Sequence, residues 1–385
     1  MTLRALRPAG NRICAANPTR VVKPVFDDYD HAYWLNSGTA ALALAFIASL
    51  KGTAPDAEVI LPAYGCPDLV AAAHYAGVRP VLVDIQPESP HYEYSQLEAA
   101  ITPKTVAIVA ATLLGIRADH HRLRKIINLR PITLIEDSAQ WFPRQTGQTF
   151  FGDLVVLSFG RGKPLSALGG GALLASKALP DAVLRHIHPV RTSRTDAARA
   201  VLKRISYNAL IHPILYGLAE KVPYLHIGAT VFHELEQIRA APMNIASLLS
   251  VNIDAYRQRS IHIQEHWRSA LHQLSQPLFV DLCTLHDVPA DYMLPRYPLL
   301  IKNASLRNRL YDSLRHQGLG TSVMYRYPLM QIEKVADLAT RFADDDNATT
   351  FADQLLTLPT HGAVTSDIVA RTISTMHKEL SALPN

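Results

Sequence analysis

The chain has 385 residues, of which 48% are apolar and 18% are charged. That length favours two domains, and the apolar fraction is large enough for an extensive core, which argues against a disordered protein. The net charge of +5 is spread along the chain rather than gathered into a Lys/Arg tract, so a nucleic-acid-binding protein is not expected.

The N-terminus, MTLRALRPAGNR, carries positive charges, but no apolar stretch follows them, so a signal peptide is not expected. No apolar run reaches the roughly 18 residues of a membrane-spanning helix. Cys14, Cys66 and Cys283 lie far apart and form no CxxC pair, a pattern typical of a reducing compartment. These features predict a soluble, cytoplasmic protein.

From about residue 33, short runs rich in Val, Ile and Leu alternate with helical stretches. The runs predict strands, and the stretches between them predict helices at 39–50, 67–76 and 119–129. The predicted strands lack polar alternation, as strands covered by helices on both faces do, and they lie at 58–61, 80–84, 106–111, 132–136, 154–158 and 172–176. This order predicts an α/β domain with a mainly parallel sheet, whose chemistry lies in the loops at the carboxyl ends of the strands.

The pattern changes after residue 177. An apolar helical segment, 197–233, is interrupted by prolines at 213 and 223, and one long helix is predicted over 245–274. The elements expected beyond it form a smaller C-terminal α/β domain and comprise a strand at 296–302, a helix at 304–317 and a closing helix near 365–380. We therefore divide the chain into a large domain, residues 1–245, and a small domain, residues 246–385.

Two motifs after neighbouring strands carry groups suited to pyridoxal phosphate (PLP) chemistry. IEDSAQ (135–140) places Asp137 at the end of a buried strand, and SFGRGK (158–163) places Lys163 five residues after Ser158. A lysine amine forms a Schiff base with the cofactor when partial desolvation keeps the amine neutral. A carboxylate against the pyridine nitrogen keeps that nitrogen protonated, which the cofactor needs as an electron sink.

A third motif suits the cofactor's phosphate. In NSGTAAL (36–42), Ser37, Gly38 and Thr39 form a small-residue turn at a helix start, where free backbone N–H groups and the helix dipole favour an anion. Taken singly, each motif has an ordinary structural interpretation: a helix cap, a strand-end cap at Asp137 and a solvated lysine. Their order and spacing together favour the cofactor site.

The same stretches resemble the DegT/DnrJ/EryC1/StrS family of fold-type-I aminotransferases. The resemblance is nearly continuous over 33–176 and patchy afterwards; it runs through NSGTAALALA, AEVILPAYGCPDLVAAAHYAGVRPVLVDIQPES, AAITPKTVAIVAATLLG, LIEDSAQ, FGDLVVLSFGRGKPLSALGGGALLAS and LLTLPTHGAVTSDIV. It implies a homodimer whose large domain has a mostly parallel, seven-stranded-type sheet.

The resemblance also implies roles for individual residues. Lys163 would form the Schiff base and move protons, Asp137 would pair with the pyridinium, and Gln140 would lie near the cofactor's phenolic oxygen. Gly38, Thr39 and Ser158 would hold the phosphate, with Ser37 beside them. The lysine also separates this chain from the family's dehydratases, in which a histidine takes its place.

Three positions depart from the family pattern. The aromatic residue that stacks on the cofactor falls on Cys66, with Tyr64 two residues earlier, and either one could take that role. The Asn-x-Arg pair that reaches the partner subunit's phosphate is missing before Met243, where Arg239 or Asn244 could substitute. The histidine-bearing segment near the end of the family pattern reads MYRYPLMQ (324–331).

The segment 197–233 has two open interpretations. Helical spacing places Leu202, Ile205 and Leu210 on one stripe, and Ile214 and Leu215 continue it. The stripe could pack in the core or in a subunit contact, as helix faces usually do. Alternatively, it could line the acceptor entrance or meet an apolar carrier or a membrane surface.

Other site types are not expected. Among the 17 histidines there are short-range pairs at 120–121, 186–188 and 262–266, but these have no HExxH motif and no cysteine partners, so no metal site is predicted. LGGGALL (168–174) lacks the GxGxxG spacing after a strand, so a dinucleotide-binding site is not expected. We interpret it as a tight turn before a strand.

The sequence therefore predicts a PLP-dependent aminotransferase. Its donor is expected to be Glu or Gln, by family habit, and its acceptor a keto-sugar on a nucleotide or lipid carrier. One alternative is an aminotransferase that acts on a non-sugar carbonyl compound of secondary metabolism. The other is a non-catalytic PLP-binding regulator or scaffold, which the intact lysine argues against.

Overall fold

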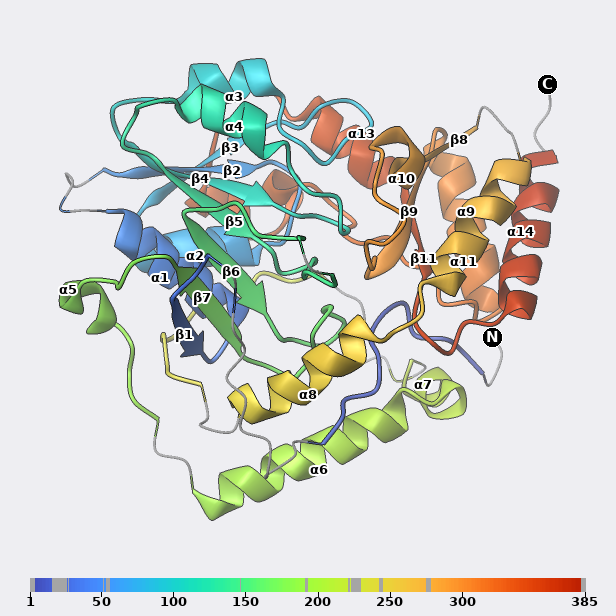
Figure 1. Ribbon diagram of the computed structural model, residues 1–385. Coiled ribbons are helices and arrows are strands. Elements are labelled where there is room, and N and C mark those ends of the chain that lie inside the picture. Colours follow the sequence, from blue (N-terminus) through green and yellow to red (C-terminus); the bar gives the residue numbers. More distant parts are fainter. Residues whose placement is uncertain are drawn as a thin grey trace.

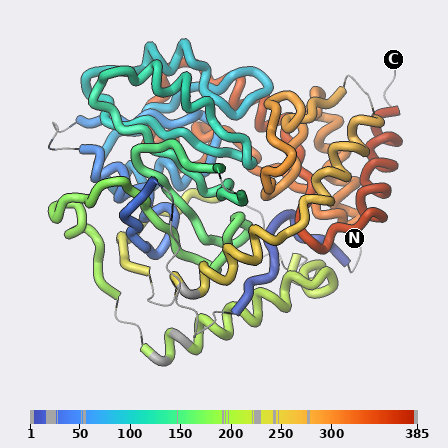
Figure 2. The backbone as a smooth tube through the Cα atoms, viewed as in Figure 1, coloured from blue at the N-terminus to red at the C-terminus, as the bar shows by residue number. Residues whose placement is uncertain are grey.

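The structure is a computed structural model, and it shows one large sheet covered by helices beside a smaller group of strands and helices (Figures 1 and 2). It describes residues 4–15, 26, 28–50, 52, 56–145, 147–190, 193–220, 222, 230–241, 245–274 and 278–381. No helix in this described part of the chain is long and apolar enough to cross a bilayer.

The large sheet has eight strands in the order β1-β7-β6-β5-β4-β2-β3-β10. Their bounds are β1 His31–Leu35, β2 Glu58–Pro62, β3 Arg79–Val83, β4 Thr105–Ala111, β5 Thr133–Asp137, β6 Leu154–Ser158, β7 Gly171–Ala175 and β10 Thr340–Arg341. Only the pairs β6–β7 and β7–β1 are antiparallel. The predicted mostly parallel, seven-stranded sheet is therefore confirmed, and the two-residue β10 extends its edge.

Helices cover both faces of this sheet because its strands are apolar on both. Val59 and Leu61 of β2 belong to the cluster that includes α1 (Gly38–Ser49) and α2 (Asp68–Ala76), whereas Ile60 packs with the other face's helices. Those are α3 (Tyr94–Ala100) and α4 (His120–Ile127). Alternate residues of a strand point to opposite faces, so a strand buried on both sides shows no polar alternation in its sequence.

The smaller group contains an antiparallel sheet in the order β11-β9-β8, with β11 at Leu355–Pro359, β9 at Arg296–Ile301 and β8 at Phe279–Asp281. The helices of this part of the chain are α9 His262–Leu274, α10 Leu282–Leu285, α11 Ala304–His316, α12 Val335–Leu338, α13 Asp346–Gln354 and α14 Ser366–Ser381, together with a 3-10 turn at Leu329–Gln331. α14 packs against both α9 and α11. The strand, the helix and the closing helix predicted here are all present.

The single helix predicted over 245–274 is wrong: the chain forms two helices, α8 (Ile245–Arg257) and α9. α8 buries Leu249 and Ile253 in a cluster that includes β6 and β7, while α9 buries Trp267 in the core shared with the smaller sheet. The two helices thus turn their apolar faces toward different neighbours, and the helical structure is interrupted at 258–261. The domain boundary at 245/246 stays a prediction; α8, just beyond it, packs with the large sheet.

The segment 197–233 is helical as predicted over 197–210 and 213–219, whereas 222 and 230–233 are not helical, and 221 and 223–229 lie outside the described residues. It forms α6 (Arg194–Leu210) and α7 (Pro213–Ala219), and the first residue of α7 is Pro213. A short α5 (Asp181–Leu184) precedes them. The N-terminal segment runs between α6 and α8 (Figure 1), held by the N–H groups of Ile13 and Cys14, which donate to Asn208 Oδ1 and Asn252 Oδ1.

Candidate active site

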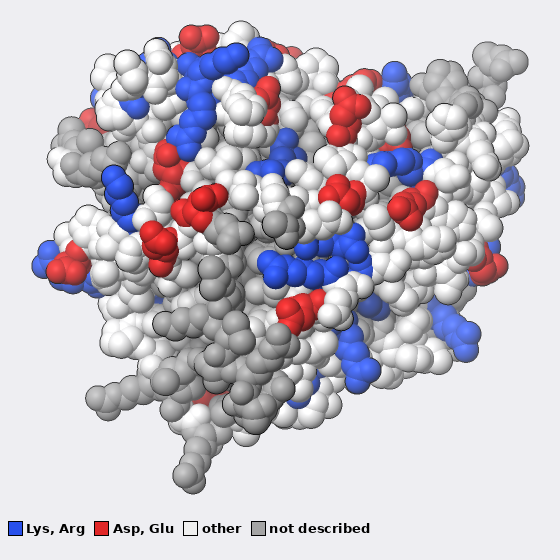
Figure 3. Space-filling view, viewed as in Figure 1, with Lys and Arg blue, Asp and Glu red and all other residues white. Residues whose placement is uncertain are grey.

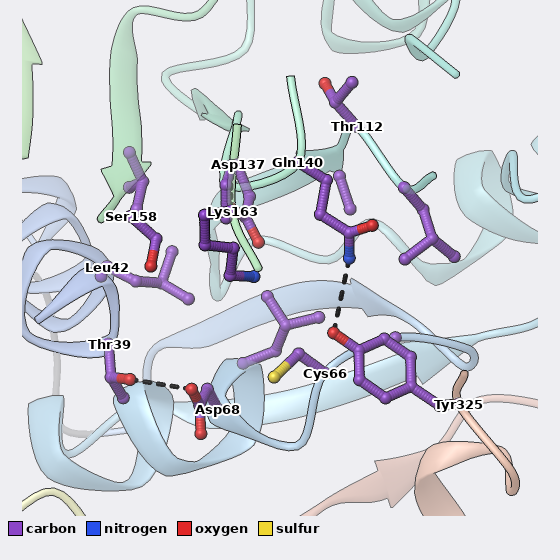
Figure 4. A pocket seen from close by; sticks show the side chains of 17 residues that line it. Thr39, Leu42, Cys66, Asp68, Thr112, Asp137, Gln140, Ser158, Lys163 and Tyr325 are labelled. Carbon is purple, nitrogen blue, oxygen red and sulfur yellow. Dashed lines mark hydrogen bonds between the residues drawn. The ribbon is translucent and has the colours of Figure 1, made fainter. Parts of the chain in front are cut away.

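The predicted residues meet in one pocket at the carboxyl ends of β4, β5 and β6 (Figure 4). The pocket is partly open, and it contains about 580 Å³ of space between atoms when the adjoining open solvent is included. Seven of the nine predicted site residues line it, namely Gly38, Thr39, Cys66, Asp137, Gln140, Ser158 and Lys163. Ser37 and Tyr64 do not. Parallel strands bring residues that are distant in sequence to one edge of a sheet, which explains this convergence.

Asp137 and Lys163 lie beside each other in Figure 4. Asp137 is the last residue of β5, and its Oδ1 accepts a hydrogen bond from Ala139 N at 3.1 Å. Burial raises the pKa of the Asp137 carboxyl, and the positive charge of Lys163 opposes that rise. A cation placed against this carboxylate would stabilise its ionised form.

The neighbouring carboxylate, Glu136, faces away from the pocket. Its Oε2 accepts the N–H groups of Phe151 and Gly152, and Arg117 lies 3.7 Å from its Oε1. Burial raises the pKa of Glu136 to about 7, while Arg117 and the two N–H groups lower it. Because adjacent strand residues point to opposite faces, Glu136 cannot replace Asp137 in the pocket.

The N-terminus of α1 forms one wall. Ser37 caps the helix: its side chain accepts Ala40 N at 3.0 Å, and its carbonyl accepts Ala41 N. The first-turn amides of Gly38 and Thr39 therefore remain for a ligand. A Cβ on Gly38 would lie 2.7 Å from Ser158 Cβ, so only glycine lets the helix approach the end of β6 this closely.

Asp68 is a polar neighbour that sequence reasoning missed. It lies in the first turn of α2, and Thr39 Oγ1 donates to its Oδ2 at 3.0 Å. Its carboxylate lines the same pocket as the start of α1. The charge of Asp68 opposes the binding of an anion at that helix N-terminus.

A hydrogen-bonded chain crosses the pocket from Leu114 to Tyr325. Leu114 N donates to Gln140 Oε1 at 3.0 Å, and Gln140 Nε2 donates to the Tyr325 hydroxyl at 3.4 Å. Cys66 also hydrogen-bonds Tyr325, and burial raises the pKa of the Cys66 thiol to about 12. Cys66 therefore stays a neutral thiol at ordinary pH.

Of the two residues predicted to contact the cofactor ring, only Cys66 lines the pocket. Tyr64 is fully buried behind it, with its hydroxyl bonded to the backbone of Tyr325 and its ring 5.0 Å from that of Phe351. The aromatic ring in the pocket lining comes instead from Tyr325, in the segment 324–331. No local sequence signal distinguishes Tyr325 from Tyr327.

The two substitutes proposed for the missing Asn-x-Arg pair have different outcomes. Arg239 does not line the pocket; its backbone N–H donates to Asn36 Oδ1 and its Nε to Gln237 Oε1. Asn244 lies outside the described residues. The role of a partner subunit at this position stays a prediction.

A model of the DegT/DnrJ/EryC1/StrS aminotransferase family matches residues 25–377. The chain belongs to this family. It is accordingly a PLP-dependent aminotransferase, as the resemblance predicted.

Two relatives and one solved structure illustrate the range of the DegT/DnrJ/EryC1/StrS family. The chain is 25% identical over 362 residues to UDP-2-acetamido-2-deoxy-3-oxo-D-glucuronate aminotransferase of Pseudomonas aeruginosa. The aligned region covers 91% of this chain and 88% of that protein. It is 31% identical over 149 residues to 3-amino-5-hydroxybenzoate synthase of Amycolatopsis mediterranei, over 37% of each chain. The fold is that of S. venezuelae DesV, which was solved in complex with a ketimine intermediate. The two structures superpose with a TM-score of 0.67, and the matched residues are 23% identical and cover 92% of this chain and 86% of that one.

The pocket residues fit the cofactor of the family. Thr112 also lines the pocket, although its hydroxyl points away from Lys163 and Asp137 (Figure 4). Lys163 supplies the amine, Asp137 a carboxylate, and α1 an anion-binding helix start beside Ser158. Only Asp68 opposes this fit.

Proposed function

We propose that this enzyme transfers an amino group from an amino acid, Glu or Gln, to the keto group of a sugar on a nucleotide carrier. The observation that supports this most directly is that Lys163, Asp137 and the N-terminus of α1 share one pocket. These are the three groups that attach the cofactor, tune its ring and bind its phosphate. The relative from Pseudomonas aeruginosa, whose name includes a UDP-linked keto-sugar, supports the acceptor class.

The cofactor supplies an electron sink for the negative charge that develops beside the amine. Lys163 Nζ would hold the cofactor and, once the substrate amine has displaced it, would remove and return the proton on the carbon next to the substrate nitrogen. Asp137 would hold a proton on the ring nitrogen. This assignment is supported by the burial of Asp137, since a buried carboxylate is stabilised by a cation in contact with it.

We assign the phosphate to the amides of Gly38 and Thr39 and to the hydroxyl of Ser158. The close approach of Gly38 to Ser158 supports this, because it brings both donors to one side of the pocket. Cys66 is assigned to the ring contact because it lines the pocket and Tyr64 does not. Gln140, held by Leu114 and Tyr325, is assigned to the phenolic oxygen.

The acceptor class is tested with enzyme that carries the cofactor in its amine form. The loaded enzyme is mixed separately with nucleotide-linked keto-sugars, lipid-linked keto-sugars and non-sugar ketones or aldehydes, and the return of the yellow form is followed spectroscopically. The proposal predicts the fastest return with a nucleotide-linked keto-sugar. Return of the yellow form with non-sugar carbonyl compounds alone would favour the alternative, an aminotransferase that acts on a non-sugar acceptor. The relative named 3-amino-5-hydroxybenzoate synthase, whose name contains no sugar, illustrates that alternative.

The non-catalytic alternative is tested with Asp137→Asn, because an uncharged amide cannot hold the ring proton. We expect this variant to retain the cofactor and to lose turnover by several orders of magnitude, at about 1.4 kcal/mol per tenfold change in rate. Equal amino-group exchange by variant and wild type would remove Asp137 from the mechanism. A wild-type protein that binds the cofactor but exchanges with no donor would support the regulator or scaffold.

We also propose a cytoplasmic homodimer. The outer sides of α6 and α7 carry large apolar side chains that are between 37% and 64% exposed, which we call the α6–α7 surface: Val201, Leu202, Ile205, Leu210, Ile214, Leu215 and Leu218. Their exposure supports a contact with another molecule more than packing within the same chain. An exposed apolar area of this extent marks a contact with another molecule. A second copy of the chain is our proposed partner, and an apolar carrier is the alternative.

A further inference from the structure

The side-chain amide of Gln140 is held in one orientation at the edge of the pocket. The backbone N–H of Leu114 can only donate, so the atom that accepts it at 3.0 Å must be the carbonyl oxygen of the Gln140 side chain. Gln140 Nε2 is therefore directed the other way, and it donates to the Tyr325 hydroxyl at 3.4 Å (Figure 4). An amide nitrogen carries two N–H groups, so the second one remains for a ligand in the pocket that Gln140 lines.

The Tyr325 hydroxyl accepts from Gln140 because its own proton is directed at Cys66. Burial raises the pKa of both Tyr325 and Cys66; the hydrogen bond between them adds to that rise in Tyr325 and opposes it in Cys66. A bond that favours the neutral phenol and the charged sulfur has the tyrosine O–H as donor and the sulfur as acceptor. The family pattern has an aromatic residue where this chain has Cys66, so the link through sulfur is a feature of this chain.

Tyr64 holds the backbone of Tyr325. Its hydroxyl donates to the Tyr325 carbonyl at 2.7 Å and accepts the Tyr325 N–H at 2.5 Å. The Tyr64 side chain is 1% exposed, and its ring lies 5.0 Å from that of Phe351 on α13. Close packing leaves this ring little room to move, so the position of Tyr64 determines where the Tyr325 hydroxyl lies.

A donor in this place has a measurable effect on a bound cofactor. The phenolic oxygen of PLP lies next to the Schiff-base nitrogen and shares the proton that this nitrogen carries. A hydrogen-bond donor on that oxygen draws its negative charge away, which makes it a weaker partner for the proton and lowers the pKa of the nitrogen. The Schiff base is yellow when it is protonated. The pH at which the yellow colour is lost therefore reports how firmly the donor is held.

We propose that Tyr325 is a positioning residue that keeps the second N–H of Gln140 on the phenolic oxygen of the cofactor, and that Tyr64 acts through Tyr325. The proposal rests on the proposed function and on the assignment of Gln140 within it. Leu114 sets which end of the amide faces the cofactor, and Tyr325 sets where that end lies. Since Tyr325 acts only through Gln140, the effects of substituting the two residues should not add.

The test titrates the colour of the PLP-loaded enzyme with pH. Tyr325→Phe removes one hydroxyl, Tyr64→Phe keeps the packed ring but loses both bonds to the Tyr325 backbone, and Gln140→Ala removes the donor itself. Gln140→Ala should raise the pH of the colour change by about 0.5–1 unit, which is the strength of an ordinary hydrogen bond on the pH scale. Tyr325→Phe and Tyr64→Phe should raise it by up to the same amount. Tyr325→Phe decides the question if Tyr64→Phe does not fold.

A double variant separates positioning from direct contact. Gln140→Ala combined with Tyr325→Phe should shift the colour change by the same amount as Gln140→Ala alone, because no amide is left to position. Tyr327→Phe is the matched control. Tyr327 belongs to the same segment as Tyr325, but it is 46% exposed and does not line the pocket, so this variant should titrate as wild type.

Surface charge is the same in all of these variants. Figure 3 shows Lys and Arg side chains interspersed with Asp and Glu side chains over one face of the molecule, and none of the substitutions alters such a residue. Distant charges also move a pKa, but here they cancel in the comparison of variant with wild type. A difference in titration therefore reports the hydrogen bonds around Gln140.

An unchanged titration in the folded Tyr325→Phe and Tyr64→Phe variants, beside a shifted Gln140→Ala, would overturn the positioning role alone. A double variant that shifts by the sum of its two single shifts would also overturn it, since Tyr325 would then act on the cofactor without Gln140. If Gln140→Ala titrated as wild type, the assignment of Gln140 to the phenolic oxygen would fail together with this proposal. A wild-type protein that never becomes yellow with PLP would overturn the proposed function itself.

Discussion

The substitution Gly38→Ala tests how α1 forms the phosphate site. An added Cβ would lie 2.7 Å from Ser158 Cβ, 2.9 Å from its Oγ and 3.3 Å from its Cα. Carbon atoms in contact are normally about 3.5–4.0 Å apart, so the helix start must move away from β6. Such overpacking costs about 1–3 kcal/mol, against a gain of up to about 1 kcal/mol from the helix propensity of alanine. The cofactor-free variant should therefore lose no more than about 3 kcal/mol of unfolding free energy.

Gly38→Ala should also weaken cofactor binding, by a separate amount. Loss of one hydrogen bond to a charged phosphate costs about 1.5–3 kcal/mol, which is about a 10- to 150-fold rise in the dissociation constant for PLP. Equilibrium dialysis measures that constant, and thermal unfolding of the cofactor-free protein measures stability.

Gly362→Ala is the matched control, because a Cβ there meets no atom within 4 Å. Adding Ser158→Gly to Gly38→Ala removes the two closest overlapping atoms and should restore stability. If Gly38→Ala bound PLP as tightly as wild type, the contact between α1 and Ser158 would have no part in phosphate binding.

Three further predictions concern charge and surface. Asp68→Asn should tighten PLP binding by about three- to tenfold in the same dialysis assay, because it removes a negative charge beside the phosphate site; weaker binding would show that the carboxylate is needed to hold Thr39. The pKa of Glu136 is raised from 4.5 to about 7, so its contribution to stability is present below pH 4.5 and is lost as the pH rises through 7, a change on the order of 3 kcal/mol. Denaturant unfolding of Glu136→Gln should lack that pH dependence, and identical pH profiles of variant and wild type would contradict it. Leu210→Ser combined with Leu215→Ser should give a monomer by sedimentation if a second copy covers the α6–α7 surface, whereas an intact dimer with weakened acceptor use would favour an apolar carrier.

The elements that the sequence predicted best are those whose signal is local. The strands of the large sheet are short, apolar and bounded by turns, and each predicted strand agrees with the structure within about one residue at either end. Asp137 and Lys163 were predictable for the same reason, because Asp137 ends its strand and Lys163 lies in the loop that follows the next strand. The parallel sheet then brings them together without further information.

The features that the sequence did not predict depend on contacts between distant segments. Tyr325 reaches the pocket from a position 185 residues beyond Gln140, its hydrogen-bond partner. The turn between α8 and α9 arises because each helix buries its apolar face against a different core, although the sequence shows one continuous helical pattern. Tyr64 and Cys66 looked equivalent by position, and only the packing of Tyr64 against Phe351 separates them.

The central claim is that Lys163 carries the cofactor, and borohydride reduction followed by peptide mapping tests it most directly. Reduction fixes the cofactor permanently to the nitrogen that holds it, so the labelled peptide identifies the lysine without an assay of turnover. The account predicts the label on Lys163 and no yellow form in Lys163→Ala. A label on Lys104 or Lys177, or a Lys163→Ala variant that still becomes yellow with PLP, would contradict it.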